Sequence, residues 1–405
     1  MTRASQAQPA EPTRPYRSQR RPRPVRQQQE PEQIVSVGSM DYTIYLVVVL
    51  LTLIGVVMVF SASYEQAANR AVFQNDAFFF LRRNGLMAIG GFIVMNITAN
   101  VNYEHYKRLA PMIYLVTLGL LIAVVVIGIA SHGAQRWIPF PIIQRFQPSE
   151  VAKAATIFML AYMVDKSPKG LYTWKGLIFF CAVLGLITGL VLYGGFSSAL
   201  IVAAIGFGMI FIASPHIWRF ILGGGAGVAA IVGYLVYDAN FGDGFRGARF
   251  RAWINPWAYP DTRGFQTIQS LYAIGSGGLF GSGIGQSRQA TFVPEAHHDI
   301  IFAIIVEELG FIGSSMILLL FGIFIWRGIK VALNAHNTFA AMTAIGIVLA
   351  IAFQALINIA VVTNTIPNTG VTLPFISYGG TSLIVSMGLA GVLLNISRYT
   401  KAKDR

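Results

Sequence analysis

Forty consecutive residues without a charged side chain decide the fold class of this chain. Their sequence is GLIFFCAVLGLITGLVLYGGFSSALIVAAIGFGMIFIASP, at residues 176–215. A helix that rises 1.5 Å per residue needs about 20 residues to cross the hydrocarbon of a bilayer, so this stretch is too long for one crossing. Tyr193, Gly194, Gly195 and Phe196 lie at its middle and favour a turn. We therefore predict a hairpin of two transmembrane helices.

Similar uncharged stretches recur along most of the chain. Of its 405 residues 55% are apolar and 12% charged, which is about half the charged fraction of a soluble domain. We predict an all-α, polytopic integral membrane protein with about ten transmembrane helices. Besides the hairpin, the predicted spans lie near residues 42–63, 85–101, 109–131, 151–164, 220–237, 300–326, 338–363 and 375–396. The fourth is long enough only if Pro148, Ser149 and Glu150 form its first turn.

The distribution of Lys and Arg predicts the orientation of these spans. Residues 1–40 contain seven Arg and few apolar residues, which is typical of a disordered basic tail. With this tail in the cytoplasm, the inner segments hold 19 Lys and Arg and the outer segments hold 10. Cytoplasmic loops are enriched in these residues, so we expect both termini inside, with a membrane domain at 41–400 and a short tail at 401–405. The net charge of +13 fits this orientation, and we expect no nucleic-acid partner.

The segment at 238–299 is then the one large extracytoplasmic loop. It is rich in aromatic residues, and we expect re-entrant or interfacial helices in it. Arg246, Arg249 and Arg251 lie close together among these aromatic residues, and Arg288 follows later. Such a group suits the binding of a phosphate ester at the headgroup level. The alternative is an ordinary solvated mixture, because the loop holds five basic and five acidic residues.

Asp299 stands where this loop enters the eighth predicted span. Aspartate is a favoured N-cap residue, so a purely structural role is one interpretation. The other is a partly desolvated carboxylate with a raised pKa that takes a proton from a substrate hydroxyl. Both roles are compatible. The neighbouring His297 and His298 give a weak hint of a metal, but adjacent residues seldom bind one ion, and we expect no metal site there. Cys181 is the single cysteine, so no disulfide within the chain is possible.

Two further features have a structural and a functional interpretation. The glycine run at 275–285 follows no strand and precedes no Walker lysine, so we do not expect nucleotide binding. It provides tight turns, or exposed amides that help to hold a pyrophosphate. Glu307 and Glu308 lie about two turns into the eighth span. Either they form a salt bridge with Lys153 of the fourth span, or they shape a hydrated substrate cavity.

Three separated blocks together strongly resemble the SEDS family (FtsW/RodA/SpoVE), with a modest preference for its FtsW/SpoVE branch. The first is GAQRWI at 133–138 with FQPSEVAK at 146–153. The second extends from GFQ at 264–266 through VPEAHHD to EELG, which ends at residue 310. The third is TGVTLPFISYGGTS at 369–382, followed by ISR at 396–398. Two departures stand out: residues 193–195 replace a common proline-aspartate pair, and His298-Asp299-Ile300 replaces the commoner Thr-Asp-Phe.

The resemblance implies a bacterial inner-membrane peptidoglycan glycosyltransferase, active in cell division. Such an enzyme polymerises lipid II outside the membrane with a class B penicillin-binding protein and other division proteins. The family's essential loop aspartate falls on Asp299. Glu150 and Lys153 match conserved positions of the fourth span, Arg136 matches the preceding loop, and Ser377 belongs to the third block. We count these four with Arg246, Arg249, Arg251 and Arg288 as expected substrate-binding residues.

The expected reaction explains why one carboxylate suffices. The lipid-linked donor already has a diphosphate leaving group, so transfer needs cations for the departing charge and a base for the acceptor hydroxyl. We expect Asp299 to be that base, with inversion at the anomeric carbon. A divalent cation in place of some arginines stays open, and we expect no other cofactor. A lipid II flippase is the alternative function, because intramembrane Glu307, Glu308 and Lys153 would also suit a transporter. A scaffold for division proteins is a third.

Overall fold

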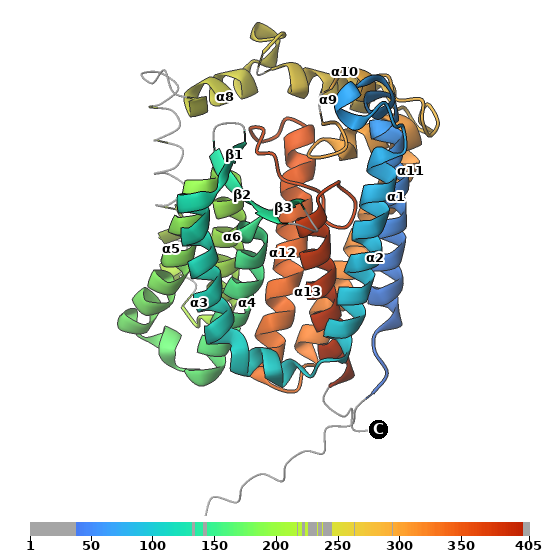
Figure 1. Cartoon of the computed structure of the whole chain (residues 1–405). Coiled ribbons are helices and arrows are strands. Elements are labelled where there is room, and N and C mark those ends of the chain that lie inside the picture. Colours follow the sequence, from blue (N-terminus) through green and yellow to red (C-terminus); the bar gives the residue numbers. More distant parts are fainter. Residues whose placement is uncertain are drawn as a thin grey trace, which may run out of the picture. The chain divides into compact units, whose positions relative to one another are not determined.

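The described part of the chain is a bundle of long helices with short elements gathered at one end (Figure 1). The computed structural model describes residues 38–131, 134–140, 144–216, 218–220, 223–225, 233, 237, 245–262, 264–293 and 295–399. The predicted tail at 1–40 lies outside these residues except for its last three, as does the predicted tail at 401–405. Most of the predicted seventh span at 220–237 also lies outside them.

Nine helices of at least 18 residues form the bundle within the described residues. They are α1 (Tyr42–Asn69), α2 (Phe79–Asn100), α3 (Tyr103–Ile127), α4 (Pro148–Lys166), α5 (Trp174–Gly194), α6 (Phe196–Ala213), α11 (Ile301–Leu333), α12 (Thr338–Val362) and α13 (Gly380–Arg398). All except α2 and α4 are long and apolar enough to cross a membrane. α2 packs along α13, and α4 along α3 and α12. The all-α membrane class is confirmed, while the number ten stays a prediction.

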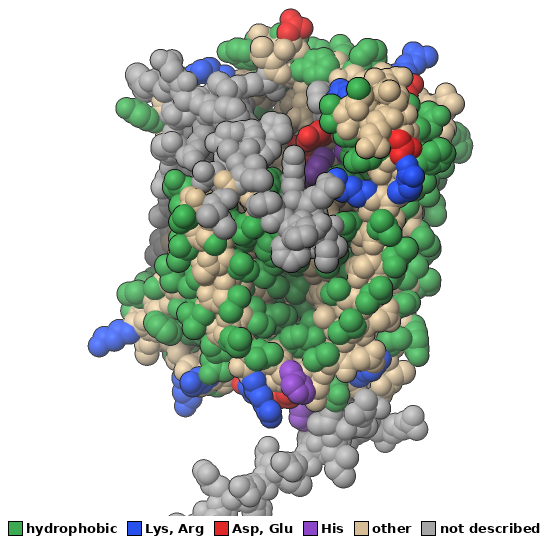
Figure 2. All heavy atoms as spheres, viewed as in Figure 1, with side chains coloured by type: hydrophobic (Ala, Val, Ile, Leu, Met, Phe, Trp, Pro, Cys, Tyr) green, Lys and Arg blue, Asp and Glu red, His purple; other side chains and the backbone are tan. Residues whose placement is uncertain are grey.

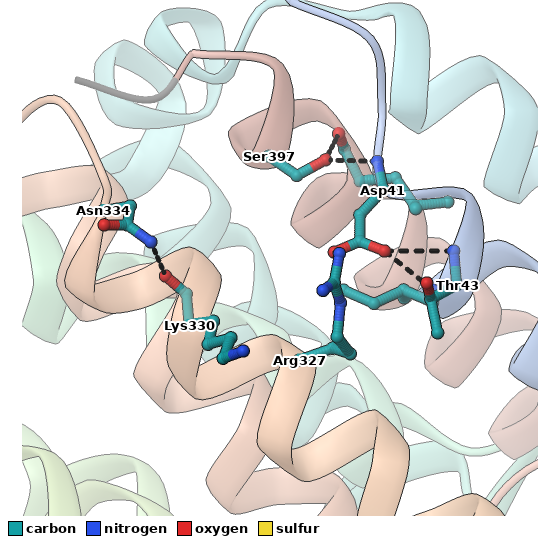
Figure 3. Close-up of polar contacts among 8 residues, drawn as sticks. Asp41, Thr43, Arg327, Lys330, Asn334 and Ser397 are labelled. Atoms are coloured by element: carbon teal, nitrogen blue, oxygen red, sulfur yellow. Dashed lines mark hydrogen bonds and ion pairs between the residues drawn. The ribbon is translucent and has the colours of Figure 1, made fainter. Parts of the chain in front are cut away.

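Two polar contacts along α1 are separated by a length that matches a bilayer. Asp41 caps the start of α1, forms an ion pair with Nη2 of Arg327 at 2.6 Å, and donates its amide to Oγ of Ser397 (Figure 3). Further along, eight residues before α1 ends at Asn69, Oγ of Ser61 donates to the Glu308 carboxylate at 2.6 Å. Twenty residues of helix separate Asp41 from Ser61, which is about 30 Å and equals the hydrocarbon thickness. Hydrophobic side chains cover the middle of the face in Figure 2, with Lys and Arg at both ends.

The hairpin forms as expected, and so does the helix predicted for the fourth span. α5 ends at Gly194 and α6 begins at Phe196, so the turn falls on the expected residues. α4 begins at Pro148, which occupies the first helical position, where proline is favoured because it lacks only an N–H that has no helical partner. Its 19 residues then rise about 28 Å, enough to cross the hydrocarbon.

The prediction for the start of the tenth span is wrong. The helix begins at Gly380 rather than at residue 375, and Phe375 has a left-handed backbone with φ of +64°. Leu373, Phe375 and Ile376 are buried inside the protein, as part of the connection between α12 and α13. Hydropathy alone does not distinguish apolar side chains that face protein from those that face lipid, which explains the error.

A small antiparallel sheet joins α3 to α4, a feature that the sequence analysis did not predict. Its strands are β1 (Ile129–Ser131), β2 (Ala134–Phe140) and β3 (Gln144–Phe146), in that spatial order. Ile129 pairs with Trp137, and Ile138 with Phe146. The sheet lies at the end of the bundle away from the C-terminus, where α8 (Phe245–Ile254), α9 (Phe265–Ser276) and α10 (Gln289–Phe292) of the large loop also lie (Figure 1).

α11 is broken at Gly310, whose φ of +68° and ψ of −172° interrupt the helix. The first half leaves the carbonyl groups of Glu307 and Glu308 without helical partners. The glycine run supplies these partners: the Ser282 amide donates to Glu307 at 2.9 Å, and the Gly283 amide to Glu308 at 3.0 Å. These amides of the run are therefore used to end a helix.

The same run starts the second half of α11. The amide of Phe311 donates to the Gly278 carbonyl at 2.9 Å, and that of Ile312 to the Leu279 carbonyl at 3.1 Å. A Cβ at Gly281 would lie 2.1 Å from the Glu308 carbonyl oxygen, which accounts for a glycine at that position. The structural interpretation of the run therefore holds, and the amides of residues 281–283 are not available to a pyrophosphate.

Candidate active site around Asp299

Asp299 lies just before α11 but does not cap it. The N-cap residue is Ile300, and no side chain caps this helix. Oδ1 of Asp299 instead accepts a hydrogen bond from Nε2 of Gln266 in the first turn of α9, at 3.0 Å. The Asp299 carbonyl accepts from Nδ2 of Asn358 in α12, at 2.6 Å. The N-cap interpretation is therefore wrong, because the carboxylate bonds to α9 and caps no amide of α11.

The connection between α12 and α13 completes the surroundings of this carboxylate. Nδ2 of Asn368 donates to Oε1 of Gln266 at 2.8 Å, and the Gly370 amide donates to Oδ1 of Asn368 at 3.1 Å. Gly370 has a φ of +68°, and a Cβ there would lie 3.8 Å from Oδ2 of Asp299. Three segments far apart in the chain therefore meet at one carboxyl group.

The environment of Asp299 raises its proton affinity. Burial raises the pKa of the Asp299 carboxyl above its usual value, and the nearby Glu295 acts in the same direction. His298 and the hydrogen bond from Gln266 lower the pKa and offset part of this rise. Residue 299 is still partly accessible to solvent. A half-buried carboxylate with a raised pKa suits a general base.

His297 packs inside the protein beside this site. Its ring packs against those of Phe80 and Tyr378, with centroids 4.3 and 5.3 Å away, and these two rings also contact each other. Burial lowers the pKa of His297 to about 3, so the imidazole is neutral at physiological pH. In the described ranges of the chain, no three His, Cys, Asp or Glu side chains gather as metal ligands. His297 therefore packs against aromatic rings of α2 and of the connection that leads to α13.

Lys153 forms its ion pair within its own helix. Its Nζ lies 2.7 Å from Oε2 of Glu150, one turn earlier in α4. The same Nζ donates to Oε1 of Gln354 in α12 at 2.7 Å. The predicted salt bridge with Glu307 or Glu308 is therefore wrong. Those carboxylates are also buried, and they accept hydrogen bonds from Ser287, from the Arg288 amide and from Ser61.

One face of α12 links Lys153 to Asp299. Gln354 and Asn358 lie one turn apart on this helix. Nε2 of Gln354 donates to the Thr372 carbonyl at 3.0 Å, and Nδ2 of Asn358 donates to the Val371 carbonyl at 2.7 Å as well as to Asp299. The two amide side chains therefore hold residues 371–372 between the ion pair of α4 and the carboxylate.

The remaining expected site residues are distributed around this centre. Ser377 is buried, and its Oγ accepts from the Leu373 amide at 2.7 Å, which indicates a structural role in the turn. Arg288 is exposed. Arg251 is half-buried on α8. The side chains of Arg246 and Arg249 on α8 and of Arg136 on β2 lie outside the described residues.

α8 is tied to the connection that contains Asn368. Nε1 of Trp253 donates to the Asn364 carbonyl at 3.0 Å, and Nδ2 of Asn364 donates back to the Trp253 carbonyl at 3.3 Å. α8, which carries the arginines, is therefore anchored to Asn364, four residues before Asn368. In Figure 2, acidic and histidine side chains lie together near the end of the bundle where α8 lies.

The amide residues of the site were not among the residues expected from the sequence. Gln354 and Asn358 are polar side chains four residues apart within an otherwise apolar span, which is the kind of signal that marks an inward-facing helix surface. Gln266 and Asn368 lie in segments of mixed polarity and give no comparable signal. Their roles depend on contacts that only the folded chain provides.

Comparisons with known proteins agree with the resemblance seen in the motifs. Residues 41–402 match the family model FTSW_RODA_SPOVE, described as a cell cycle protein. Stage V sporulation protein E of Bacillus subtilis (strain 168) is 41% identical over 368 residues, covering 87% of this chain and 95% of that protein. A probable peptidoglycan glycosyltransferase FtsW of Geobacter sp. (strain M18) is 40% identical over 354 residues, covering 86% and 94%.

Solved structures show the same fold. A chain of a peptidoglycan synthase complex aligns with a TM-score of 0.72 at 24% identity, covering 89% of this chain and 98% of that chain. The rod shape determining protein RodA of Thermus thermophilus aligns with a TM-score of 0.64 at 24% identity, covering 90% and 98%. Sequence, fold and motifs agree, and the chain belongs to the SEDS (FtsW/RodA/SpoVE) family, in its FtsW/SpoVE branch.

Proposed function

We propose that this chain is a peptidoglycan glycosyltransferase that polymerises lipid II during cell division, with Asp299 as the general base. Curated relatives of about 40% identity include proteins named probable peptidoglycan glycosyltransferase FtsW. The single observation that carries the role of Asp299 is its placement: a half-buried carboxylate, held by Gln266 and free of helix capping, with a raised pKa. Such a group is suited to accept a proton from a sugar hydroxyl.

The proposed reaction forms one glycosidic bond and breaks one bond to the diphosphate. Asp299 takes the proton from the GlcNAc 4-hydroxyl of one lipid-linked unit, and that oxygen attacks the anomeric carbon of MurNAc in another. The bond between this carbon and the diphosphate breaks, the bonding electron pair leaves with the lipid diphosphate, and the anomeric configuration inverts. The leaving group is stable as an anion, so the step needs nearby positive charge rather than a general acid.

The arginines of the large loop are the proposed source of that positive charge. Lys153 is buried and neutralised by Glu150, so we assign this pair to holding Gln354 and residue Thr372 rather than to direct contact with the diphosphate. Arg246, Arg249 and Arg251 on α8 are the group that we assign to it, together with Arg288 later in the same loop. A divalent cation is the alternative. Polymerisation in excess EDTA distinguishes the two, because a diphosphate held by arginine still reacts there.

We place the site on the outer side of the bacterial inner membrane. Gly38 donates its amide to the Arg398 carbonyl at 2.9 Å, so the two ends of the described chain meet at one end of the bundle. The excess of Lys and Arg in the segments on that side supports a cytoplasmic location for both termini. α8 and α9 lie at the opposite end (Figure 1), and Asp299 is bonded to Gln266 of α9.

The proposed partner is a class B penicillin-binding protein, together with other division proteins. The structural neighbour from a peptidoglycan synthase complex supports such a partner, because that complex coordinates polymerization and crosslinking. Lipid II is the proposed substrate. The flippase alternative loses its main support, since Glu307 and Glu308 are occupied by internal hydrogen bonds and Lys153 by Glu150.

A polymerisation assay tests the base. Purified Asp299→Asn protein, supplied with lipid II and its transpeptidase partner, should give products at background level. Asp261→Asn changes an exposed acid of the same loop and should retain wild-type activity. Polymer made by Asp299→Asn at the wild-type rate would remove Asp299 as the base. Transfer of labelled lipid across liposomes without any polymer would instead favour the flippase.

A further inference from the structure

The two oxygens of the Asp299 carboxylate have different surroundings. Oδ1 accepts the hydrogen bond from Gln266 at 3.0 Å. Within the part of the chain that the structure describes, no hydrogen bond from another residue to Oδ2 is present. Gly370 lies beside this oxygen, and a Cβ built on that glycine would lie 3.8 Å from Oδ2. One oxygen is therefore held by the protein, and the other faces a position without a side chain.

A chain of amide groups fixes which way Gln266 points. The main-chain amide of Gly370 can only donate, so the atom of Asn368 that it contacts must be the acceptor Oδ1. The Asn368 NH₂ group then faces Gln266 and donates to Oε1 at 2.8 Å. Gln266 must therefore present its own NH₂ group to Asp299. The direction of every hydrogen bond follows from one backbone amide.

We infer that Gln266 is a positioning residue for the polymerisation reaction: it holds Oδ1 of Asp299 so that Oδ2 is the oxygen that receives the proton of the acceptor hydroxyl. This inference rests on the proposed function and deepens it. Asn368 supports Gln266 from the connection after α12, and Gly370 keeps the space beside Oδ2 open. A base oriented in this way meets the hydroxyl in one geometry, which favours the reaction.

The charged groups around Asp299 make the role of Gln266 measurable. His298 and Glu295, on the same segment, act on its pKa in opposite directions. α9, α12 and residues 363–379 contain no Asp, Glu, Lys, Arg or His, and Tyr378 is the titratable residue of that connection near His298. Gln266 is thus the contact from a neighbouring element that lowers the pKa of Asp299. Its removal should raise that pKa.

The test is the pH dependence of the polymerisation rate. A general base works in its deprotonated form, so a higher pKa moves the acidic limb of the profile to higher pH. For Gln266→Ala we expect a shift of about one pH unit, with the rate on the limb reduced at least tenfold. Gln266→Glu has nearly the same shape, lacks the donor and adds a negative charge, so its limb should shift further upward.

Gln269→Glu is the matched control. It makes the same change on the same helix, three residues away, at a side chain for which the structure shows no hydrogen bond to Asp299. Its acidic limb should shift less than that of Gln266→Glu, because the added charge lies one turn away and no hydrogen bond to Asp299 is lost. An unchanged limb in Gln266→Glu, whatever the loss of rate, would overturn the inference, because a merely structural residue alters the rate without moving the limb. Gln266→Glu decides the matter if Gln266→Ala does not fold.

The outcome separates this inference from the proposed function. If Asp299→Asn retains full activity, Asp299 is not the base and both fail. If Asp299→Asn is inactive while the limb of Gln266→Glu stays at the wild-type position, only the role of Gln266 fails. An inactive Asp299→Asn with upward shifts in both Gln266 variants supports both.

Discussion

Lys153 and Glu150 form an ion pair within α4, with Nζ and Oε2 2.7 Å apart, at side chains that are 6% and 11% exposed. The pair is neutral as a unit, and Gln354 of α12 accepts a further hydrogen bond from the ammonium group. A buried pair is costly to break, because the remaining charge loses its partner while it stays out of water. The pair therefore fixes α4 against α12 at the level of the site.

The first prediction concerns this pair. Glu150→Gln leaves Lys153 charged and buried, and should lower the free energy of unfolding by about 3–5 kcal/mol. The double variant Glu150→Gln/Lys153→Met removes both charges and should recover most of the loss. Thermal unfolding in detergent measures both. A double variant no more stable than the single one would contradict a buried pair of this kind.

The second prediction concerns the break in α11. Gly310→Ala forces a side chain into a φ of +68° and places its Cβ 2.4 Å from the Gly281 amide nitrogen. The backbone term alone should cost about 1–3 kcal/mol, and the contact adds to it. Gly322→Ala, on the same helix with no atom within 4 Å, is the control and should leave stability unchanged or slightly raised. Equal unfolding temperatures for the two variants would argue against the break.

The third prediction concerns the anchoring of α8. Trp253→Phe keeps an aromatic ring but loses the Nε1 donor to Asn364, so the arginines of α8 are held less firmly. The loss of one such hydrogen bond, about 1 kcal/mol, should lower kcat/KM for lipid II about fivefold. Trp257→Phe changes an exposed tryptophan that follows α8 and should have little effect. Steady-state polymerisation kinetics measure both, and equal values for the two variants would refute the anchor.

The fourth prediction concerns acid stability. Burial lowers the pKa of His297 to about 3 in the folded protein, whereas an exposed histidine has a value of 6.5. Below pH 6.5 the unfolded chain binds a proton that the folded chain does not, so stability falls by about 1.4 kcal/mol per pH unit until pH 3. His297→Phe keeps an aromatic ring against Phe80 and Tyr378 and removes this term. Its unfolding temperature should fall less between pH 6.5 and 4 than that of the wild type. Identical slopes for His297→Phe and the wild type would disprove the assignment.

Local patterns in the sequence predicted the membrane class and most helix positions. The hairpin turn at residues 193–196 and the start of α4 at Pro148 were both expected, because glycine turns and proline at the first helical position act within a few residues. The family was also recognised from motifs, and the comparisons confirm it. The start of α13 was misplaced, because Phe375 and Ile376 are apolar but face protein.

Residue patterns alone indicated the membrane class, most of the helices, the family and the candidacy of Asp299, since hydropathy and motif spacing are properties of neighbouring residues. Which groups touch that carboxylate, and which partner Lys153 takes, depends on how the folded chain packs. Gln266 is 33 residues from Asp299, and Asn368 is 102 residues from Gln266. Hydrogen bonds across such separations depend on how α9, α11 and α12 pack, and a single amide side chain carries no local sign of the partner that packing brings to it.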